Sequence, residues 1–339
     1  MSASTETSAI AMDAGIEHAA EAALEKIAAA KLAIGKVIFG QETVVEQTLV
    51  TLLSGGHGLL VGVPGLAKTR LVETLGVVLG LDARRVQFTP DLMPADILGS
   101  EILEEGPDRA RSFRFLPGPI FAQLLMADEI NRASPRTQSA LLQAMQEQHV
   151  SVAGVRHELP RPFHVLATQN PLEQEGTYPL PEAQLDRFLM QIDVGYPDRA
   201  AEKRIMIATT SAEESPPQAA MSAPELMTIQ RLVRRLPIGE TVVEAILDIV
   251  RSARPNDTGE GDPKITKLIA WGPGPRAAQA LMLAARARAL VDGRLSPSID
   301  DLAHLVEPVL KHRMALTFAA RAEGESLAGV ITRLTARLG

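Results

Sequence analysis

The segment that most constrains the fold of this chain is Gly62-Val63-Pro64-Gly65-Leu66-Ala67-Lys68-Thr69. It follows an apolar run at residues 59–61 and precedes a helical pattern over residues 70–79. A strand, a glycine-bearing loop that ends in Lys-Thr and a helix are together the layout of a phosphate-binding P-loop. Because backbone N–H groups and a helix N-terminus favour an anion, the segment predicts a site for the phosphates of a nucleotide.

Three side chains of this loop make the prediction more specific. Lys68 is placed to reach the terminal phosphates, and the Thr69 hydroxyl to ligate Mg²⁺. Ala67 departs from the strict pattern, which has a second glycine at this position. Alanine is tolerated only where φ is negative, so we expect the loop to be helical already at residue 67. The alternative is a chance loop with no ligand.

Length and composition bound the class of protein. The chain has 339 residues, enough for about two domains with separate cores. Its 46% hydrophobic and 22% charged residues are ordinary for a globular protein. The net charge of −7 argues against a general nucleic-acid binder, which usually has a basic surface.

The cellular compartment is predicted from what the sequence lacks. The absence of cysteine excludes disulfides and thiolate metal sites and is typical of a reducing compartment. No apolar run reaches the length of a membrane span, and residues 1–15 lack the basic and apolar regions of a secretory signal. We therefore expect a cytoplasmic protein without a membrane span.

From residue 59 onward, short apolar runs alternate with helical patterns. This alternation predicts an α/β fold with a mostly parallel sheet covered by helices. Two inserts, at residues 101–116 and 150–159, have the pattern of hairpins that turn at residues 105–108 and at Ala153-Gly154. The predicted sheet strands lie at residues 59–61, 85–88, 124–127, 164–167 and 188–194.

Helical patterns flank the α/β region. An Ala-rich stretch at residues 16–34 predicts a packed helix, because one of its faces carries Ala20, Ala23, Leu24, Ile27, Ala30 and Ile34. Residues 211–224 are rich in Ser, Pro, Ala and Glu and predict a linker. Helical patterns follow at residues 225–236, 241–252, 275–291, 298–310 and 323–338. The expected parts are a tail and helix (1–36), an α/β domain (37–210), a linker (211–224) and a helical domain (225–339).

Polar side chains follow two further strands. Residues 124–127 end in Asp128 and Glu129, at the sheet edge where the P-loop also opens. There Asp128 would hold Mg²⁺, directly or through water, and Glu129 would polarise the attacking water. Another strand ends in Thr168-Gln169-Asn170-Pro171, where Asn170 would orient the water or touch the γ-phosphate. Taken alone, the acidic pair is a solvated turn and Asn170 a helix cap or turn former.

These segments together resemble an AAA+ ATPase of the MoxR family, and the resemblance covers the chain from Val37 on. It is carried by the P-loop and five further phrases. They are Gly118-Pro119-Ile120-Phe121, Asp128-Glu129-Ile130-Asn131-Arg132, Ser139-Ala140-Leu141-Leu142-Gln143-Ala144-Met145-Gln146-Glu147, Ala167-Thr168-Gln169-Asn170-Pro171 and Pro181-Glu182-Ala183-Gln184-Leu185-Asp186-Arg187-Phe188. The fold it implies is a P-loop AAA+ parallel-sheet domain with two hairpin inserts, followed by an all-α lid domain.

The resemblance also implies residue roles. Lys68 corresponds to the Walker A lysine, Asp128 and Glu129 to the Walker B pair, and Asn170 to the polar sensor beside the γ-phosphate. Arg187 matches the arginine finger that completes the neighbouring subunit's site, and Arg276 matches the sensor arginine of the lid. ATP would lie on Gly62, Val63, Pro64, Gly65, Leu66, Ala67, Lys68, Thr69 and Arg70, with its adenine against Val37, Ile38 and Phe39.

Some of these residues have simpler explanations. Arg187 follows Asp186, so a weak local ion pair is the alternative to the finger. Arg276 stands at a helix start, where a bound phosphate would offset its unfavourable interaction with the helix dipole. His312 and Arg313 are expected on a polar helix face. Residues 89–94 are expected either to face a substrate or to form a buried loop.

The resemblance implies an ATP-hydrolysing chaperone that needs Mg²⁺. Such proteins work as rings, most often hexamers, and remodel or activate partners, often ones with a von Willebrand factor A domain or a metal cofactor. Two other functions fit the ATPase core. One is a nucleic-acid motor or loader, which the negative charge disfavours. The other is a nucleotide-gated scaffold with little turnover, which Glu129 disfavours.

Overall fold

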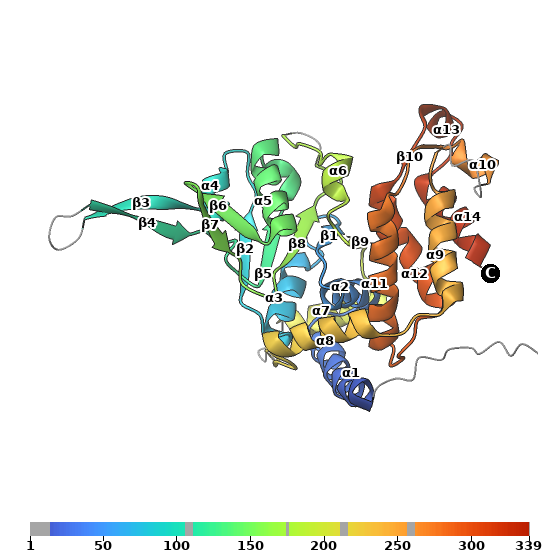
Figure 1. The fold of residues 1–339 in the computed structure, drawn as a ribbon, viewed down its shortest axis with the longest axis horizontal. Helices are drawn as coiled ribbons and strands as arrows, with labels where there is room; N and C mark the ends of the chain where they lie inside the picture. The colour runs from blue at the N-terminus through green and yellow to red at the C-terminus, as the bar shows by residue number, and fades with distance from the viewer. Residues whose placement is uncertain (1–13, 106–110, 174–175, 211–215, 256–261, 339) are drawn as a thin grey trace, which may run out of the picture.

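A computed structural model describes residues 14–105, 111–173, 176–210, 216–255 and 262–338, with side chains from residue 19. Figure 1 shows an α/β part beside a helical part, with one long hairpin projecting from the α/β side. Residues 1–13 of the predicted tail, residues 106–108 of the predicted hairpin turn and residues 211–215 of the predicted linker lie outside the described residues.

The centre of the α/β part is a five-stranded parallel sheet in the order β2-β5-β8-β1-β9. This confirms the predicted parallel sheet, and each strand overlaps one predicted run. The strands are β1 (Gly58–Val61), β2 (Ala83–Gln87), β5 (Leu124–Asp128), β8 (His164–Gln169) and β9 (Met190–Asp193). Because they all run in one direction, the loops after β1, β5 and β8 open at the same edge.

Both faces of this sheet are buried, since successive side chains of a strand point to opposite faces. Leu60 packs with α1 (Ala14–Gly35), α2 (Glu42–Leu53) and α3 (Lys68–Val78), whereas Leu59 packs with α5 (Pro135–Glu147). The core around Leu60 continues without interruption into the lid helices. The lid is therefore packed firmly on one side of the α/β part.

The two predicted hairpins are confirmed. One consists of β3 (Gly99–Glu105) and β4 (Arg111–Pro117), the other of β6 (His149–Val152) and β7 (Val155–Glu158). The first follows the short α4 (Pro94–Leu98) and extends away from the body of the protein (Figure 1). At its base a Cβ on Gly118 would lie 2.2 Å from the carbonyl oxygen of Ile97, so this position requires glycine.

The predicted helical lid is confirmed, with two differences in detail. An antiparallel pair, β10 (Ile269–Trp271) and β11 (Ala315–Leu316), was not apparent from the helical patterns. The helix predicted at residues 323–338 starts later than expected, at Leu327, because Gly324 is left-handed and Ser326 caps the helix, and its last turn at residues 336–338 is a 3₁₀ turn. The lid helices are α8 (Ala223–Arg235), α9 (Glu240–Ser252), α10 (Pro263–Thr266), α11 (Pro275–Val291), α12 (Ile299–Leu310), α13 (Phe318–Ala322) and α14 (Leu327–Thr335), and α7 (Arg199–Thr210) precedes the linker.

Helix α1 packs as its apolar stripe predicted. Ala20, Ala23, Ile27, Ala30 and Ile34 are buried, and Leu24 is half-buried against the same core. The helix contacts α2 and α3 of the α/β part and also α8 and α11 of the lid. It therefore connects the two parts of the molecule.

Candidate active site

A cleft of about 610 Å³ opens at the carboxyl edge of the sheet. The loop between β1 and α3 forms one wall, and the ends of β2, β5 and β8 form the other. It brings together three groups that lie far apart in the sequence. The lining residues are Pro64, Gly65, Leu66, Ala67, Lys68, Thr69, Arg70, Glu73, Arg85, Gln87, Asp128, Glu129, Thr168 and Asn170.

The backbone of the loop differs from the prediction at Ala67. Its φ is +57°, in the left-handed region, and α3 begins only at Lys68. The expectation of a helical residue with negative φ is therefore wrong, because the loop makes its last turn here. Gly65 is also left-handed, with φ +85°, and an added Cβ would meet only open space. At Gly62 a Cβ would lie 2.5 Å from the Val194 carbonyl oxygen.

Lys68 lies at the first position of α3 and reaches back over the loop. Its Nζ donates to the carbonyl oxygens of Gly62 and Val63, at 2.5 and 2.8 Å. Burial lowers the pKa of Lys68, and the charges of Asp128 and Glu129 act in the opposite direction. An ammonium beside two carboxylates and the free N–H groups of a helix start is suited to holding phosphate oxygens.

Asp128 ends the buried strand β5 and is only 8% exposed. Its Oδ1 accepts from the Thr168 hydroxyl at 2.5 Å, and its Oδ2 accepts from Arg85 Nη2 at 2.6 Å. Arg85 Nε also donates to Oδ2, at 3.1 Å. A carboxylate has about four lone-pair sites, so with three bonds accepted Asp128 keeps some acceptor capacity for a ligand in the cleft that it lines.

Glu129 has a left-handed backbone, with φ +54°, which turns its side chain into the cleft. Its N–H donates to the Thr168 hydroxyl oxygen at 2.8 Å. Its Oε2 accepts from Gln87 Nε2 at 2.7 Å and from Arg132 Nη1 at 2.9 Å. The carboxylate is therefore held from two sides at the position where a base would face the phosphates.

Asn170 follows β8 and lines the same cleft. Its Oδ1 accepts from the Leu172 N–H at 3.1 Å, the kind of local turn that was its simpler explanation. Its Nδ2 lies 3.5 Å from Glu173 Oε2. The placement fits both a turn former and a polar group beside a terminal phosphate.

The residues present suit Mg²⁺ bound together with a nucleotide. Mg²⁺ in proteins usually takes one or two carboxylates, waters and substrate phosphate oxygens instead of an all-protein cage. Asp128 and the Thr69 hydroxyl supply such oxygens in the cleft. Across the described part of the chain no group of three or more acidic, His or Cys side chains could hold a metal by itself.

Arg187 and Arg276 do not line the cleft. Arg187 precedes β9, whose first residue pairs with the first residue of β1, so it lies at the sheet edge opposite to the P-loop. Arg276, in the first turn of α11, lies 3.5 Å from Asp186 Oδ2. Burial, and then the charge of Arg276, lower the pKa of Arg187. The two arginines are therefore neighbours on a surface away from the cleft.

The predicted adenine segment is also outside the cleft lining. Ile38 is buried, and Val37 packs against the same core. The Arg204 guanidinium lies over the Phe39 ring, 5.5 Å from its centroid. Gln41 Nε2 donates to the Gly195 carbonyl oxygen at 2.8 Å, so this segment lies beside the chain that follows β9.

Sequence reasoning missed four cleft residues and misplaced two residues of the lid. Arg85, Gln87 and Thr168 stand on or near strand ends next to Asp128, so the rule used for Asp128 would have found them, while Glu73 lies on α3. The expectation for His312 and Arg313 is wrong, because both are buried where α12 meets β9. The segment at residues 89–94 is partly buried and partly exposed, since Leu92 packs on the core and Met93 is exposed.

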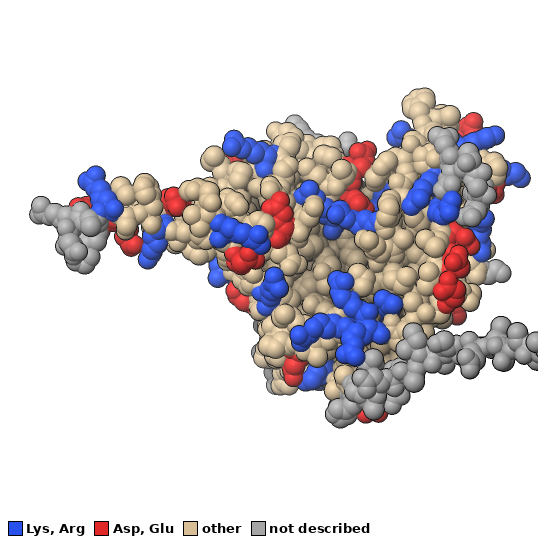
Figure 2. Space-filling view, in the orientation of Figure 1, with Lys and Arg blue, Asp and Glu red and all other residues tan. Residues whose placement is uncertain are grey.

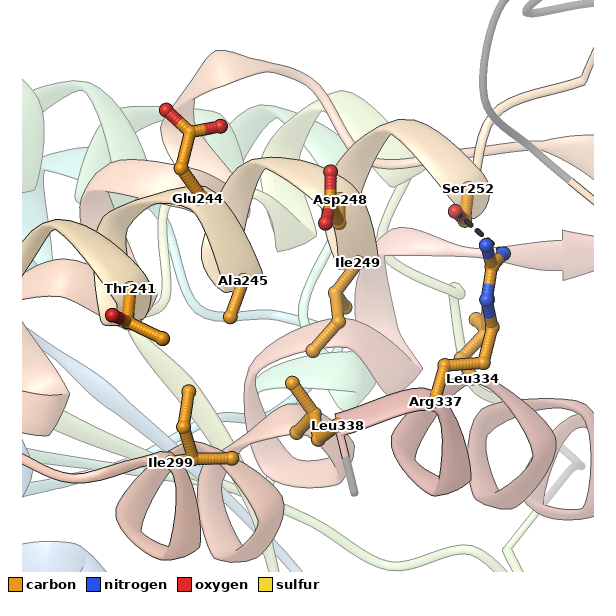
Figure 3. A pocket seen from close by; sticks show the side chains of 10 residues that line it. All are labelled: Thr241, Glu244, Ala245, Asp248, Ile249, Ser252, Ile299, Leu334, Arg337 and Leu338. Carbon is orange, nitrogen blue, oxygen red and sulfur yellow. Dashed lines mark hydrogen bonds between the residues drawn. The ribbon is translucent and has the colours of Figure 1, made fainter.

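The lid contains a separate cavity of about 320 Å³ between α9 and the C-terminal turns (Figure 3). Its floor includes Ala245, Ile249 and Ile299, and Arg337 donates to the Ser252 hydroxyl at 2.8 Å. Neither a glycine nor a lysine is among its lining residues, in contrast to the first cleft. None of the described helices is both long and apolar enough to cross a membrane.

Comparisons with known proteins agree with this geometry. Residues 57–190 match the ATPase family associated with various cellular activities (AAA), and residues 265–334 match the AAA lid domain. The chain is 44% identical to Chaperone MoxR1 of Mycobacterium tuberculosis over 304 residues, which are 89% of this chain and 78% of that protein. It is 31% identical to Protein MoxR of Paracoccus denitrificans over 88% of this chain and 91% of that one.

A solved structure supports the same relationship. The crystal structure of a candidate ATPase from Cytophaga hutchinsonii superimposes with a TM-score of 0.87 and 36% sequence identity. The match covers 96% of this chain and 98% of that one. The chain therefore belongs to the MoxR family of AAA+ ATPases.

Proposed function

We propose that this protein is an ATP-hydrolysing chaperone that works as a ring, a hexamer, and remodels or activates client proteins. The observation that carries the proposal is the convergence of Lys68, Thr69, Asp128 and Glu129 in one cleft at the carboxyl edge of the sheet. The name of the Mycobacterium tuberculosis relative supports the chaperone role. The proposed clients are proteins with a von Willebrand factor A domain or a metal cofactor, met in the cytoplasm.

The proposed chemistry follows from the side chains of the cleft. Lys68 and the first N–H groups of α3 bind the terminal phosphates of ATP, with Arg70 at the rim. Glu129 accepts hydrogen bonds from water and aligns it for attack on the γ-phosphate, while Asn170 contacts the same group. Thr69 and Asp128 would hold Mg²⁺, which neutralises phosphate charge.

A second subunit is needed to complete this site. Arg187 lies at the far edge of the sheet, so its side chain cannot serve its own cleft without a large rearrangement. Arg187 is half-buried beside Arg276, and its guanidinium is available to a neighbouring subunit. There it would stabilise the charge that develops on the phosphates of ATP during hydrolysis. This position supports a ring in which hydrolysis and subunit contacts are coupled.

Two substitutions test the catalytic assignment. We expect Lys68→Ala to lose ATP binding and Glu129→Gln to keep ATP binding while turnover falls by roughly 10² to 10⁴, the usual contribution of a positioned base. Calorimetry and phosphate release measure the two properties. The matched control is Lys267→Ala, because Lys267 is an exposed lysine of the lid. Equal hydrolysis by wild type and Glu129→Gln would refute the assignment.

The nucleic-acid alternative has one observation in its favour. Figure 2 shows basic side chains gathered over α8, whose last turns carry the exposed Arg231, Arg234 and Arg235. Cations at a helix C-terminus also suit the helix dipole, so the cluster does not need a ligand. DNA at moderate salt should leave the ATPase rate unchanged. Stimulation by DNA, and none by a partner protein trapped on Glu129→Gln with ATP, would favour the motor or loader.

A further inference from the structure

The lid holds the segment around Arg187 through one buried guanidinium, that of Arg313. Arg313 follows α12 in a short 3₁₀ turn, Lys311–Arg313, and is only 1% exposed. An arginine stays protonated in proteins, so the buried charge of Arg313 cannot be removed by loss of a proton and has to be compensated by hydrogen-bonded or oppositely charged groups. Burial lowers the pKa of Arg313, and the bond to Asp186 acts against that change.

The five N–H bonds of Arg313 are all used. Nε donates to Asp186 Oδ1 at 2.7 Å, and Nη1 donates to the carbonyl oxygens of Leu189 and Val309 at 3.1 and 2.5 Å. Nη2 donates to the carbonyl oxygens of Asp186 and Phe188 at 3.2 and 2.6 Å. Three of these five bonds go to Asp186 and Phe188, the residues on either side of Arg187, and a fourth goes to Leu189, so the backbone is held both before and after Arg187.

Neighbouring lid residues strengthen this attachment. His312 Nε2 lies 3.0 Å from the Phe188 carbonyl oxygen, and Lys311 Nζ lies 2.6 Å from Asp193 Oδ2 at the end of β9. Arg276 of α11 approaches the other oxygen of Asp186, at 3.5 Å. The edge strand and the Arg187 segment are thus tied to two separate elements of the lid.

We propose that Arg313 is a positioning residue that ties the orientation of the lid to the placement of Arg187 at the neighbouring subunit's nucleotide. The inference rests on the proposed function, in which Arg187 acts in trans. Because a planar guanidinium with five satisfied bonds has little freedom, a lid that rotates carries the Arg187 segment with it. Nucleotide-dependent lid movement in one subunit then reaches the next subunit's site.

A simple structural brace would also explain a buried arginine, so the test must separate the two roles. If Arg313 acts through Arg187, an Arg313 variant has an intact cleft and cannot complete its neighbour's cleft. If Arg313 instead supports the cleft of its own subunit, an Arg313 variant has a defective cleft and can still complete the cleft of its neighbour. A general loss of stability would affect both sides. Mixed rings distinguish these cases because each partner variant repairs only one side.

The experiment uses Arg313→Gln in the full-length protein, mixed with Glu129→Gln or with Arg187→Ala, and measures ATPase rate, ATP affinity and thermal unfolding. Alone, Arg313→Gln should bind ATP as wild type does and lose turnover by about 10²-fold, as expected for a misplaced group. The control is Arg288→Gln. Arg288 joins α11 to Glu46 of α2, a second link between lid and α/β part that does not touch Asp186.

The mixtures decide the outcome. Glu129→Gln subunits carry a correctly held Arg187, so they should restore activity to Arg313→Gln as they do to Arg187→Ala. Arg187→Ala subunits should not restore it. The reference is the mixture of Arg187→Ala with Glu129→Gln. If that mixture is active, two results overturn this inference and leave the proposed function intact: rescue of Arg313→Gln by Arg187→Ala, or no rescue of Arg313→Gln by Glu129→Gln. An inactive reference mixture refutes the proposed trans arginine and this inference with it. If Arg313→Gln unfolds, Arg313→Lys, which keeps the charge, goes through the same mixtures.

Discussion

Two residues of the cleft have backbone conformations that their side chains disfavour. Ala67 and Glu129 are both left-handed, with φ of +57° and +54°. A left-handed residue other than glycine costs roughly 1–2 kcal/mol. Local sequence gives no reason for either conformation, but both turn a functional group toward the cleft. At Ala67 the turn places Lys68 at the start of α3, and at Glu129 it directs the carboxylate away from the sheet.

The strain at Ala67 can be measured. We expect Ala67→Gly to raise the free energy of unfolding by up to about 1 kcal/mol while ATP binding is kept, because glycine adopts this φ without a Cβ clash. Urea unfolding checks it. The control is Ala22→Gly on the exposed face of α1, which should lower the same free energy by about 1 kcal/mol. A similar loss for both variants would contradict the left-handed assignment.

Among the elements, α1 shows how far a pattern can be trusted. Its period-3.6 stripe predicted the buried face correctly, because a helix has only one way to bury such a stripe. The partners of that face, α3 on one side and α8 and α11 on the other, could not be predicted from the helix itself. The same limit explains the error at residues 323–338, where the apolar spacing continued across Gly324 and Ser326 although the chain turns there.

Two residues of α1 allow a matched comparison. Ile27 is 2% exposed in the shared core, while Leu32 on the same helix is 66% exposed. We expect Ile27→Ala to lower the free energy of unfolding by about 2–5 kcal/mol, through lost burial and a cavity. Leu32→Ala should change it by less than ~0.5 kcal/mol. Chemical denaturation of both variants checks the prediction. Equal effects would mean that α1 does not pack between the two parts.

For the whole molecule, two buried histidines lie beside each other at the sheet, and one of them, His164, contacts the lid. His164 Nδ1 lies 2.8 Å from the Gly56 carbonyl oxygen, and its Nε2 lies 2.9 Å from Gln230 Nε2 of α8. His57 Nδ1 accepts from the Val165 N–H at 2.9 Å. Burial, and then the charge of His164, lower the pKa of His57 to about 3, and burial lowers the pKa of His164 to about 4. Both rings are neutral in the folded protein.

This predicts a loss of stability in mild acid. Above the ordinary histidine pKa of about 6.5 the pair contributes no pH dependence. As the pH falls from there toward 4 for His164 and 3 for His57, the unfolded chain binds protons that the folded protein excludes, so folding weakens. At pH ~5 each histidine should lower the free energy of unfolding by about 2 kcal/mol.

Urea unfolding at pH ~7 and pH ~5 measures this loss. The variant His164→Gln keeps an amide for Gln230 and should remove about half of the loss attributed to the pair. His304 is exposed on α12, so His304→Gln should retain all of it. An identical pH response in wild type and both variants would show that acid acts through other groups.

The sequence by itself determined the P-loop, the acidic pair, Asn170, and the succession along the chain of the five sheet strands, the two hairpins and most of the lid helices. Each is a local pattern, and parallel strands necessarily bring their carboxyl ends to one edge. Only the tertiary structure decided the left-handed turn at Ala67, the burial of Arg313, and the pairing of Asp186 with two lid arginines. Those features depend on contacts between segments that lie 90 and 127 residues apart, or on a turn imposed by its surroundings, and such interactions leave no periodic signal in the chain.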